Sequence, residues 1–258
     1  GIVTSPAIRG YAAASTKNWE QYAKLHGYEI EVVRGGVDEA CGPKLAKEVR
    51  QRTGPLAPVW AKICLLRKLL LQHQGSASVK PYVMVVDADT FVQDPGFDIM
   101  EELVHGLLQK DHRSAGLMFD DRNSRDDYPN CWNNGAPKFY EDSRTCRPNT
   151  FLMLFRSGSD TLQFAEAWLQ HALGDCAIHA RSLPPTQGVL WNCLLPDLER
   201  DHPGWLHVVN GMQQYYTMRL DERKFPLVHF EMDKGNLRGV AKAIARVQPS
   251  MDSTGQTE

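Results

Sequence analysis

The chain has 258 residues, of which 42% are hydrophobic and 23% are charged. This length is enough to bury a full core, and we expect one domain over residues 1–247. The formal net charge of −2 gives no electrostatic reason to expect a nucleic-acid partner. No stretch is long and apolar enough to cross a membrane, and the first residues do not form a signal-peptide pattern.

Strand and helix patterns alternate over the first third of the chain. Apolar runs of strand character occupy 2–5, 29–33 and 82–87. Apolar residues spaced three and four apart predict a helix that opens at 16–20 and ends at Gly27, and further helices over 44–51 and 59–73. This order predicts an α/β fold with a mostly parallel central sheet flanked by helices.

The remainder of the chain mixes short elements with one long irregular segment. The patterns predict helices over 99–110, 159–173, 184–195 and 236–246, and strands over 115–119, 150–156, 206–209 and 226–230. Residues 120–148 are polar and rich in proline, and so long an irregular stretch in a compact domain is usually functional or disordered. Residues 248–258 lack an apolar pattern and are expected to form a flexible tail.

The six cysteines include no Cys-x-x-Cys pair, and they are too few for a disulfide scaffold at this length, so neither a zinc site nor such a scaffold is expected. Cys64 falls in the apolar pattern of a predicted helix and is expected simply to pack there. Cys131 and Cys146 bracket much of the irregular segment and can pair in an oxidising compartment.

Two carboxylates one residue apart, Asp87 and Asp89, close the apolar run of residues 82–87. In open α/β sheets, ligands bind at the carboxyl ends of the strands, so both acids emerge where a ligand would be held. Residues two apart in a strand point the same way. Two hard oxygen ligands on one side suit Mg²⁺ or Mn²⁺, which commonly bind through few carboxylates and substrate phosphates. This pattern is typical of a nucleotide-sugar site.

Further motifs follow in a fixed order. They are Asn18-x-x-x-Tyr22-Ala23-x-x-His26-Gly27-Tyr28, Trp60-Ala61-Lys62-Ile63-x-Leu65-Leu66-Arg67, Asp87-Ala88-Asp89-Thr90, Asn149-Thr150-Phe151, Thr186-Gln187 and Val228-His229-Phe230. Over residues 1–235 this set resembles GT-A glycosyltransferases, most of all the galactosyl/xylosyltransferase family 34 group of Golgi enzymes. The resemblance implies the GT-A, Rossmann-like fold. It also implies, for a eukaryotic source, a place in the Golgi lumen with an N-terminal anchor outside this sequence.

The resemblance further implies a donor site. Asp87 and Asp89, with Ala88 between them, would hold Mn²⁺ (or Mg²⁺) against the two phosphates of a nucleotide-diphosphate sugar, expected to be a UDP-sugar. His229 matches the distal metal-ligand histidine, and imidazole suits Mn²⁺ beside carboxylates. Lys234 matches a basic residue that contacts the diphosphate.

Three other positions carry over from the same resemblance. Thr4 and Ser5, at the end of the first predicted strand, would line the nucleoside pocket. Lys62 matches a lysine position near the nucleotide, and Gln187 matches the glutamine of an Asp-Gln pair that faces the donor sugar.

The implied reaction moves the sugar to a hydroxyl of a glycan or glycoprotein acceptor with retention of configuration. Gln187 would then stabilise an oxocarbenium-like species through its amide oxygen, while the leaving phosphate takes the acceptor proton. An inverting enzyme needs a carboxylate base instead. The irregular segment offers Asp121 for that role, together with its neighbours Asp120, Asp126 and Asp127.

Two departures from the family pattern leave a second function open. Thr186 stands where the family has Asp, and Met232 stands where it has Gly. The alternative is a catalytically silent GT-A-like domain that binds carbohydrate or a protein partner. A haloacid-dehalogenase-type phosphatase is disfavoured because it needs Thr or Val where Phe91 stands. A sugar nucleotidyltransferase is disfavoured because residues 4–10 do not form a Gly-rich basic loop.

Overall fold

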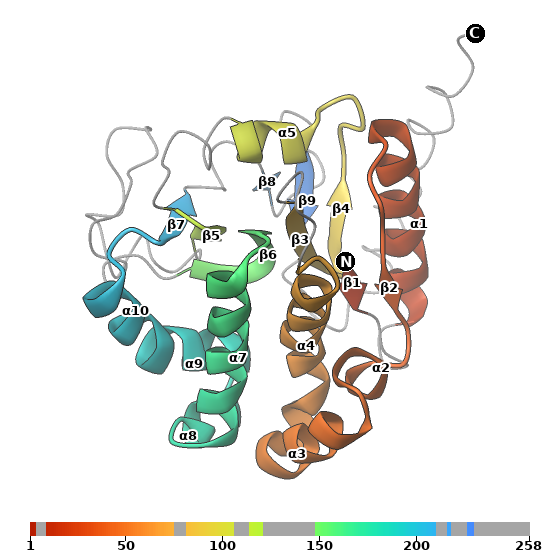
Figure 1. The fold of residues 1–258 in the computed structure, drawn as a ribbon. Helices are drawn as coiled ribbons and strands as arrows, with labels where there is room; N and C mark the ends of the chain where they lie inside the picture. Colours follow the sequence, from red (N-terminus) through yellow and green to blue (C-terminus); the bar gives the residue numbers. More distant parts are fainter. Residues whose placement is uncertain are drawn as a thin grey trace, which may run out of the picture.

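The computed structural model describes residues 1–3, 9–74, 81–105, 114–120, 148–209, 216–217 and 226–229 (Figure 1). Its strands are β1 (Ile2–Val3), β2 (Val32–Val33), β3 (Tyr82–Asp87), β4 (Thr90–Val92), β5 (Gly116–Asp120), β6 (Pro148–Arg156), β7 (Leu206–Val209), β8 (Tyr216–Thr217) and β9 (Leu227–His229). Its α-helices are α1 (Arg9–His26), α2 (Val37–Cys41), α3 (Pro43–Thr53), α4 (Ala57–Gln72), α5 (Ile99–Leu103), α7 (Ser159–Leu173), α8 (Ala177–Ala180), α9 (Pro185–Val189) and α10 (Leu195–Asp201). A 3₁₀ turn, η2 (Gly54–Leu56), precedes α4, and a π-helical turn, η6 (Leu190–Leu194), joins α9 to α10.

The larger sheet has the strand order β2-β1-β3-β6-β5-β7. Strands β1, β2 and β3 are parallel to one another, and β5 is parallel to β7, whereas β6 runs against both of its neighbours. The predicted α/β fold with a mostly parallel sheet is therefore confirmed, with β6 as the reversed strand. A second sheet has the order β4-β9-β8.

Each face of the larger sheet carries its own apolar core. Alternate side chains of β3 point to opposite faces, as the period of a strand requires. Val83 and Val85 pack with α2, α3, α4, α7, α9 and α10, whereas Val86 packs with α1 and α5. Both layers of helices therefore fix β3, the strand that carries Asp87, and a strand buried on two faces reads as a continuous apolar run.

The long, locally patterned elements agree with the sequence predictions. Helices α4 and α7 and strands β3 and β7 fall within two residues of their predicted bounds. Helix α1 begins at Arg9, well before the predicted opening at 16–20. The run Ala12-Ala13-Ala14 has a high helix propensity but carries no amphipathic pattern, which explains the missed start.

The short elements are the ones that the sequence analysis missed. These are α2, β4, α8 and β8, and each is five residues or fewer. The helix predicted over 184–195 continues through η6 and α10 to Asp201. The irregular segment, apart from the residues at its two ends, the helix predicted over 236–246 and the tail over 248–258 lie outside the described residues.

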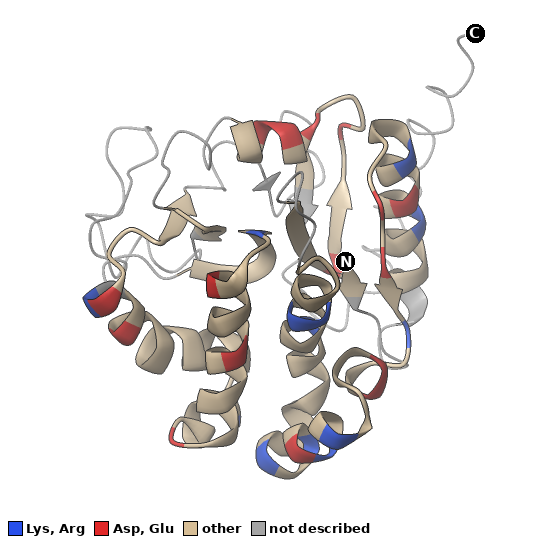
Figure 2. Cartoon of the chain, viewed as in Figure 1, with Lys and Arg blue, Asp and Glu red and all other residues tan. Residues whose placement is uncertain are grey.

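Among the described residues, charged residues lie mainly on the helices and connecting segments, and the strands carry few of them (Figure 2). Asp87 is one of the few charged residues on the strands, and it ends an interior strand of the larger sheet. Among the described helices, none is both long and apolar enough to span a bilayer.

Candidate functional site

The two acids flank a tight turn between the two sheets. Asp87 is the last residue of β3, Ala88 and Asp89 form the turn, and Thr90 begins β4. The expectation that both acids belong to one continuous strand is therefore wrong, because the chain leaves the extended conformation after Asp87. Ala88 is buried in the core beside α1 and thereby anchors the turn.

Tyr11, a residue that the sequence analysis did not single out, faces both acids from the first turns of α1. Burial raises the pKa of the Tyr11 phenol, and the negative charges of Asp89 and Asp87 raise it further. Both carboxylates are therefore close enough to act on one hydroxyl, which stays neutral and can donate a hydrogen bond. The sequence signal that could have found Tyr11 is its place a few residues after the first predicted strand, where the chain leaves the carboxyl edge of the sheet.

His229 reaches the same region through strand pairing. Strands β4 and β9 are antiparallel, with His229 opposite Thr90, Val228 opposite Phe91 and Leu227 opposite Val92. This register sets the backbone of His229 beside the residue that follows Asp89, although the two are far apart in the sequence. The structure describes the backbone of His229 and not its side chain, so its role as a metal ligand stays a prediction.

Helix α1 closes the edge of β4 with side chains instead of another strand. The Asn18 amide donates to the Val92 carbonyl (Nδ2–O 3.1 Å) and accepts from the Val92 amide (Oδ1–N 2.7 Å). Ser15 Oγ and Trp19 Nε1 both donate to the Thr90 carbonyl, at 3.0 and 2.8 Å. All three side chains are buried, so these bonds satisfy strand-edge groups that water does not reach.

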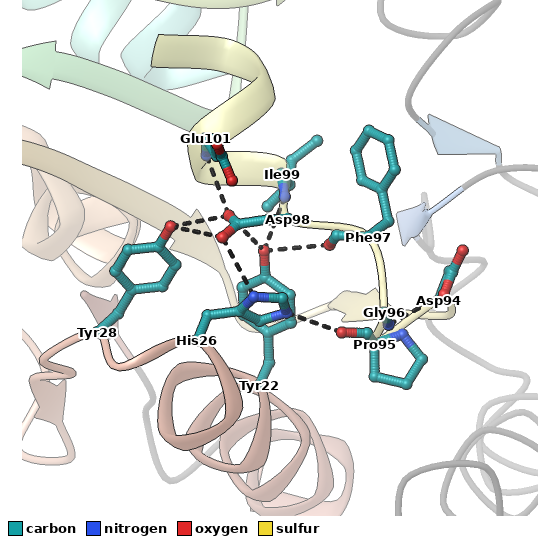
Figure 3. A network of polar contacts seen from close by, with 10 residues as sticks. All are labelled: Tyr22, His26, Tyr28, Asp94, Pro95, Gly96, Phe97, Asp98, Ile99 and Glu101. Carbon is teal, nitrogen blue, oxygen red and sulfur yellow. Dashed lines mark hydrogen bonds and ion pairs between the residues drawn. The ribbon is translucent and has the colours of Figure 1, made fainter. Parts of the chain in front are cut away.

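The next turns of α1 hold the segment after β4 (Figure 3). The Tyr22 hydroxyl accepts from the Ile99 amide at 2.8 Å, at the start of α5. The Tyr28 hydroxyl donates to the Asp98 carboxylate at 2.8 Å, and that carboxylate caps α5 by accepting from the Glu101 amide at 3.0 Å.

His26 lies in the same network. Its Nε2 is 2.8 Å from the Pro95 carbonyl and its Nδ1 is 3.1 Å from Asp98 Oδ2. The Asn18–Tyr28 motif therefore encodes a clamp on the chain that follows the two acids.

Lys62 of α4 binds Asp87 from the other side of the sheet. Its Nζ donates to Asp87 Oδ1 at 2.8 Å, to Asp87 Oδ2 at 2.9 Å and to the Thr150 carbonyl at 3.1 Å. Lys62 is only 7% exposed. Lys62 therefore pairs with one of the two acids, and its place near the nucleotide stays a prediction.

Helix α9 meets this site through β6. The Thr150 and Thr186 hydroxyls are 3.1 Å apart, and the Thr186 carbonyl accepts from Trp168 Nε1 at 3.1 Å. Thr150 and Thr186 are each 1% exposed. Gln187 directly follows Thr186, which hydrogen-bonds Thr150, the residue whose carbonyl accepts from Lys62. The Gln187 side chain is partly exposed. Its catalytic role stays a prediction.

Four other predicted site residues, Thr4, Ser5, Asp121 and Lys234, lie outside the described residues. The described donors nevertheless fit a divalent cation. Two carboxylates act on the Tyr11 phenol, and strand register brings the backbone of an imidazole-bearing residue to the same turn. Hard oxygens with one imidazole suit Mn²⁺ or Mg²⁺.

Two disulfides correct the view of the cysteines. Cys41 of α2 is bonded to Cys64 of α4, and Cys176 is bonded to Cys193. The expectation that Cys64 simply packs is wrong, although the residue is buried. Spacing along the sequence did not reveal the partner because Cys41 lies on a separate short helix that was not predicted. Cys131 and Cys146 lie outside the described residues.

A model of the galactosyl transferase GMA12/MNN10 family matches residues 4–182, more than two thirds of the chain. No curated protein sequence matches the chain. The solved structure of a glycosyltransferase involved in the glycosylation of the major capsid of PBCV-1 superposes with a TM-score of 0.55 at 14% identity. That alignment covers 96% of this chain and 98% of the other, so the two share a fold.

Two other solved structures align more loosely and add nothing to the argument. One is the galactosyltransferase LgtC in complex with donor and acceptor sugar analogs, with a TM-score of 0.42 at 9% identity over 95% of each chain. The other is mouse xyloside xylosyltransferase 1, with a TM-score of 0.43 at 10% identity over 95% of this chain and 91% of that chain.

Proposed function

The chain belongs to the galactosyl transferase GMA12/MNN10 family and is a glycosyltransferase of the GT-A fold, and from that premise we propose that it uses a UDP-sugar and Mn²⁺ to glycosylate a hydroxyl of a glycan or glycoprotein. One observation carries this proposal. The β4–β9 register brings the backbone of His229 beside the turn that follows Asp87, and this supports a metal site formed by His229, Asp87 and Asp89 at the carboxyl end of a central strand.

Asp87, Asp89 and His229 would hold the cation, which when bound offsets the negative charge that builds on the leaving diphosphate. The neutral Tyr11 phenol is placed to donate a hydrogen bond to the same region. Lys234 would add a second cation at the diphosphate, and Thr4 and Ser5 would contact the nucleoside.

We propose a retaining reaction. The bond from the anomeric carbon to the diphosphate oxygen breaks, the bond from that carbon to the acceptor oxygen forms, and the acceptor proton passes to the diphosphate. The Gln187 amide oxygen would stabilise the positive charge on the sugar ring. Should the product show inversion, Asp121 becomes the candidate base.

We further propose that the enzyme works in the lumen of the secretory pathway. Disulfides persist in oxidising compartments and are rare in the cytosol, and the Cys41–Cys64 and Cys176–Cys193 bonds support this place.

Calorimetry of UDP and GDP with and without Mn²⁺ tests the donor site, on the wild type and on Asp89→Ala. We expect Mn²⁺-dependent binding of UDP that Asp89→Ala abolishes. Binding of GDP alone would replace the nucleotide in the proposal. Binding of neither nucleotide under any metal condition would remove the donor site altogether. Proton NMR of the first transferred product then reads retention or inversion directly.

A further inference from the structure

Lys62 is a buried cation whose hydrogen bonds are all directed inward. An ammonium group has three N–H donors. The Nζ atom is 2.8 and 2.9 Å from the two Asp87 oxygens and 3.1 Å from the Thr150 carbonyl oxygen. The ammonium is therefore already engaged by Asp87 and Thr150.

Buried groups support Thr150, whose carbonyl accepts the hydrogen bond from Lys62. Thr150 hydrogen-bonds Thr186, and Thr186 accepts from Trp168, which is fully buried. The Thr186 hydroxyl is neutral, so it does not compete with Asp87 for the charge of Lys62. An acid at position 186 would stand as a second carboxylate close behind it. Because Thr150, Thr186 and Trp168 are buried and bonded to one another, they support the carbonyl that Lys62 contacts.

This arrangement sets the charge that a metal ion meets. Asp87 and Asp89 carry two negative charges, and the ammonium of Lys62 cancels one of them, so the three side chains together carry −1. A divalent cation alone would leave this set with a net charge of +1. When the divalent cation binds together with a diphosphate, the negative charge of the diphosphate offsets that excess. The site then carries no net positive charge.

Building on the proposed donor site, we propose that Lys62 is a positioning residue, a resident counter-ion of Asp87 that makes the metal bind together with the nucleotide diphosphate rather than alone. The affinity for Mn²⁺ should therefore be low without UDP and much higher with it. By linkage, UDP must gain from Mn²⁺ by the same factor.

The test compares Lys62→Met, which removes the charge and keeps the length of the side chain, with Lys62→Arg, which keeps the charge. Lys68→Met is the matched control, because Lys68 lies on the same helix and pairs with Glu31 away from the acids. Calorimetry measures the affinity for Mn²⁺ with and without UDP and the affinity for UDP at saturating Mn²⁺.

For Lys62→Met, the affinity for Mn²⁺ without UDP should rise about tenfold or more, because a positive charge beside the cation is gone. The gain in Mn²⁺ affinity that UDP brings should shrink by a similar factor. Lys62→Arg and Lys68→Met should stay within about twofold of the wild type. Lys62→Gln, which can still donate to the Thr150 carbonyl, replaces Lys62→Met if that variant does not fold.

Two results would overturn this proposal. Unchanged or weaker binding of Mn²⁺ alone in Lys62→Met would show that Lys62 does not act as a counter-ion. A loss of UDP affinity with unchanged Mn²⁺ affinity would make Lys62 a phosphate ligand instead. The titration with Mn²⁺ alone needs no nucleotide, so it judges Lys62 even if the wild type fails to bind UDP, which is the separate failure of the proposed function.

Discussion

The two sides of the acid-bearing turn are held by different kinds of interaction. On the α1 side, neutral side chains such as Ser15, Asn18 and Trp19 bind the backbone of β4. On the α4 side, the charged Lys62 binds the side chain of Asp87, and the Cys41–Cys64 disulfide ties that helix to α2. The first device fixes where the chain runs. The second fixes a carboxylate and also alters the charge of the site, so substitutions on the two sides should have different consequences.

Asp87→Ala should have the largest effect on activity. It removes a proposed metal ligand and leaves Lys62, which is almost completely buried, without its carboxylate partner. The rate of sugar transfer should fall about 10³-fold or more, because the cation that offsets the charge on the leaving diphosphate is lost. Rates of transfer from the UDP-sugar at saturating Mn²⁺ measure this effect.

Asp160→Ala is the control for Asp87→Ala, since Asp160 is an exposed acid in the first turn of α7. Its transfer rate should match that of the wild type. Activity in Asp87→Ala within tenfold of the wild type would separate the acid pair from catalysis and leave the α4 side with a structural role only.

Asn18→Leu should break the α1 side. The leucine side chain has a similar size but cannot bond the buried amide and carbonyl of Val92. Each buried group left without a partner costs about 1–3 kcal/mol, so the free energy of unfolding should fall by about 4 kcal/mol. Urea denaturation measures the change.

Lys17→Leu is the matched control for Asn18→Leu, because Lys17 is the exposed neighbour on the same helix. It should change stability by less than about 0.5 kcal/mol. If Asn18→Leu proved as mild as Lys17→Leu, the closure of β4 by α1 would carry no energetic weight.

The sequence revealed the parts of this arrangement that depend on local pattern. Strand β3 was predicted from its continuous apolar run, and helix α7 from the helical spacing of its apolar residues. The Asn18–Tyr28 motif was recognised, but the contacts that it makes were not predicted. Its partners lie some seventy residues away in β4 and α5, and no local pattern encodes contacts at that separation.

The unpredicted parts of the site are all long-range. Tyr11 lies near the acids because α1 packs against β4, the strand that follows the acid-bearing turn, and Lys62 meets Asp87 across 25 positions of the sequence. The Cys41–Cys64 pair needed the position of α2, a helix too short to give a pattern. Residue types therefore predicted the chemistry of the site, and only packing showed which groups meet.

The Cys41→Ala/Cys64→Ala double variant tests the covalent tie of the α4 side. The two cysteines are separated by 23 positions, and closing a loop of that length contributes about 3 kcal/mol to stability in the chain-entropy model. Urea denaturation should show that loss, whereas binding of Mn²⁺ and UDP to the folded variant should stay within about twofold of the wild type. A much weaker nucleotide affinity would mean that the disulfide also positions Lys62.

Tyr22→Phe should have the smallest effect at neutral pH. The phenylalanine ring fills the same space, but the Ile99 amide loses its acceptor, at a cost of about 1 kcal/mol. Burial raises the pKa of the Tyr22 phenol above its ordinary value of 10.0, and the charge of Asp98 raises it further. The unfolded chain therefore releases the phenol proton first.

The sign of the pH dependence follows from that order. The stability that Tyr22 contributes is complete below pH 10 and falls as the pH rises above it, by up to about 1.4 kcal/mol per pH unit. Urea denaturation from pH 8 to pH 11 should show the wild type losing stability faster than Tyr22→Phe, so the gap between them narrows. Parallel curves would mean that the Tyr22 phenol ionises as readily in the folded chain as in the unfolded one. The α1 side would then not depend on a neutral hydroxyl, and its contrast with the charged α4 side would disappear.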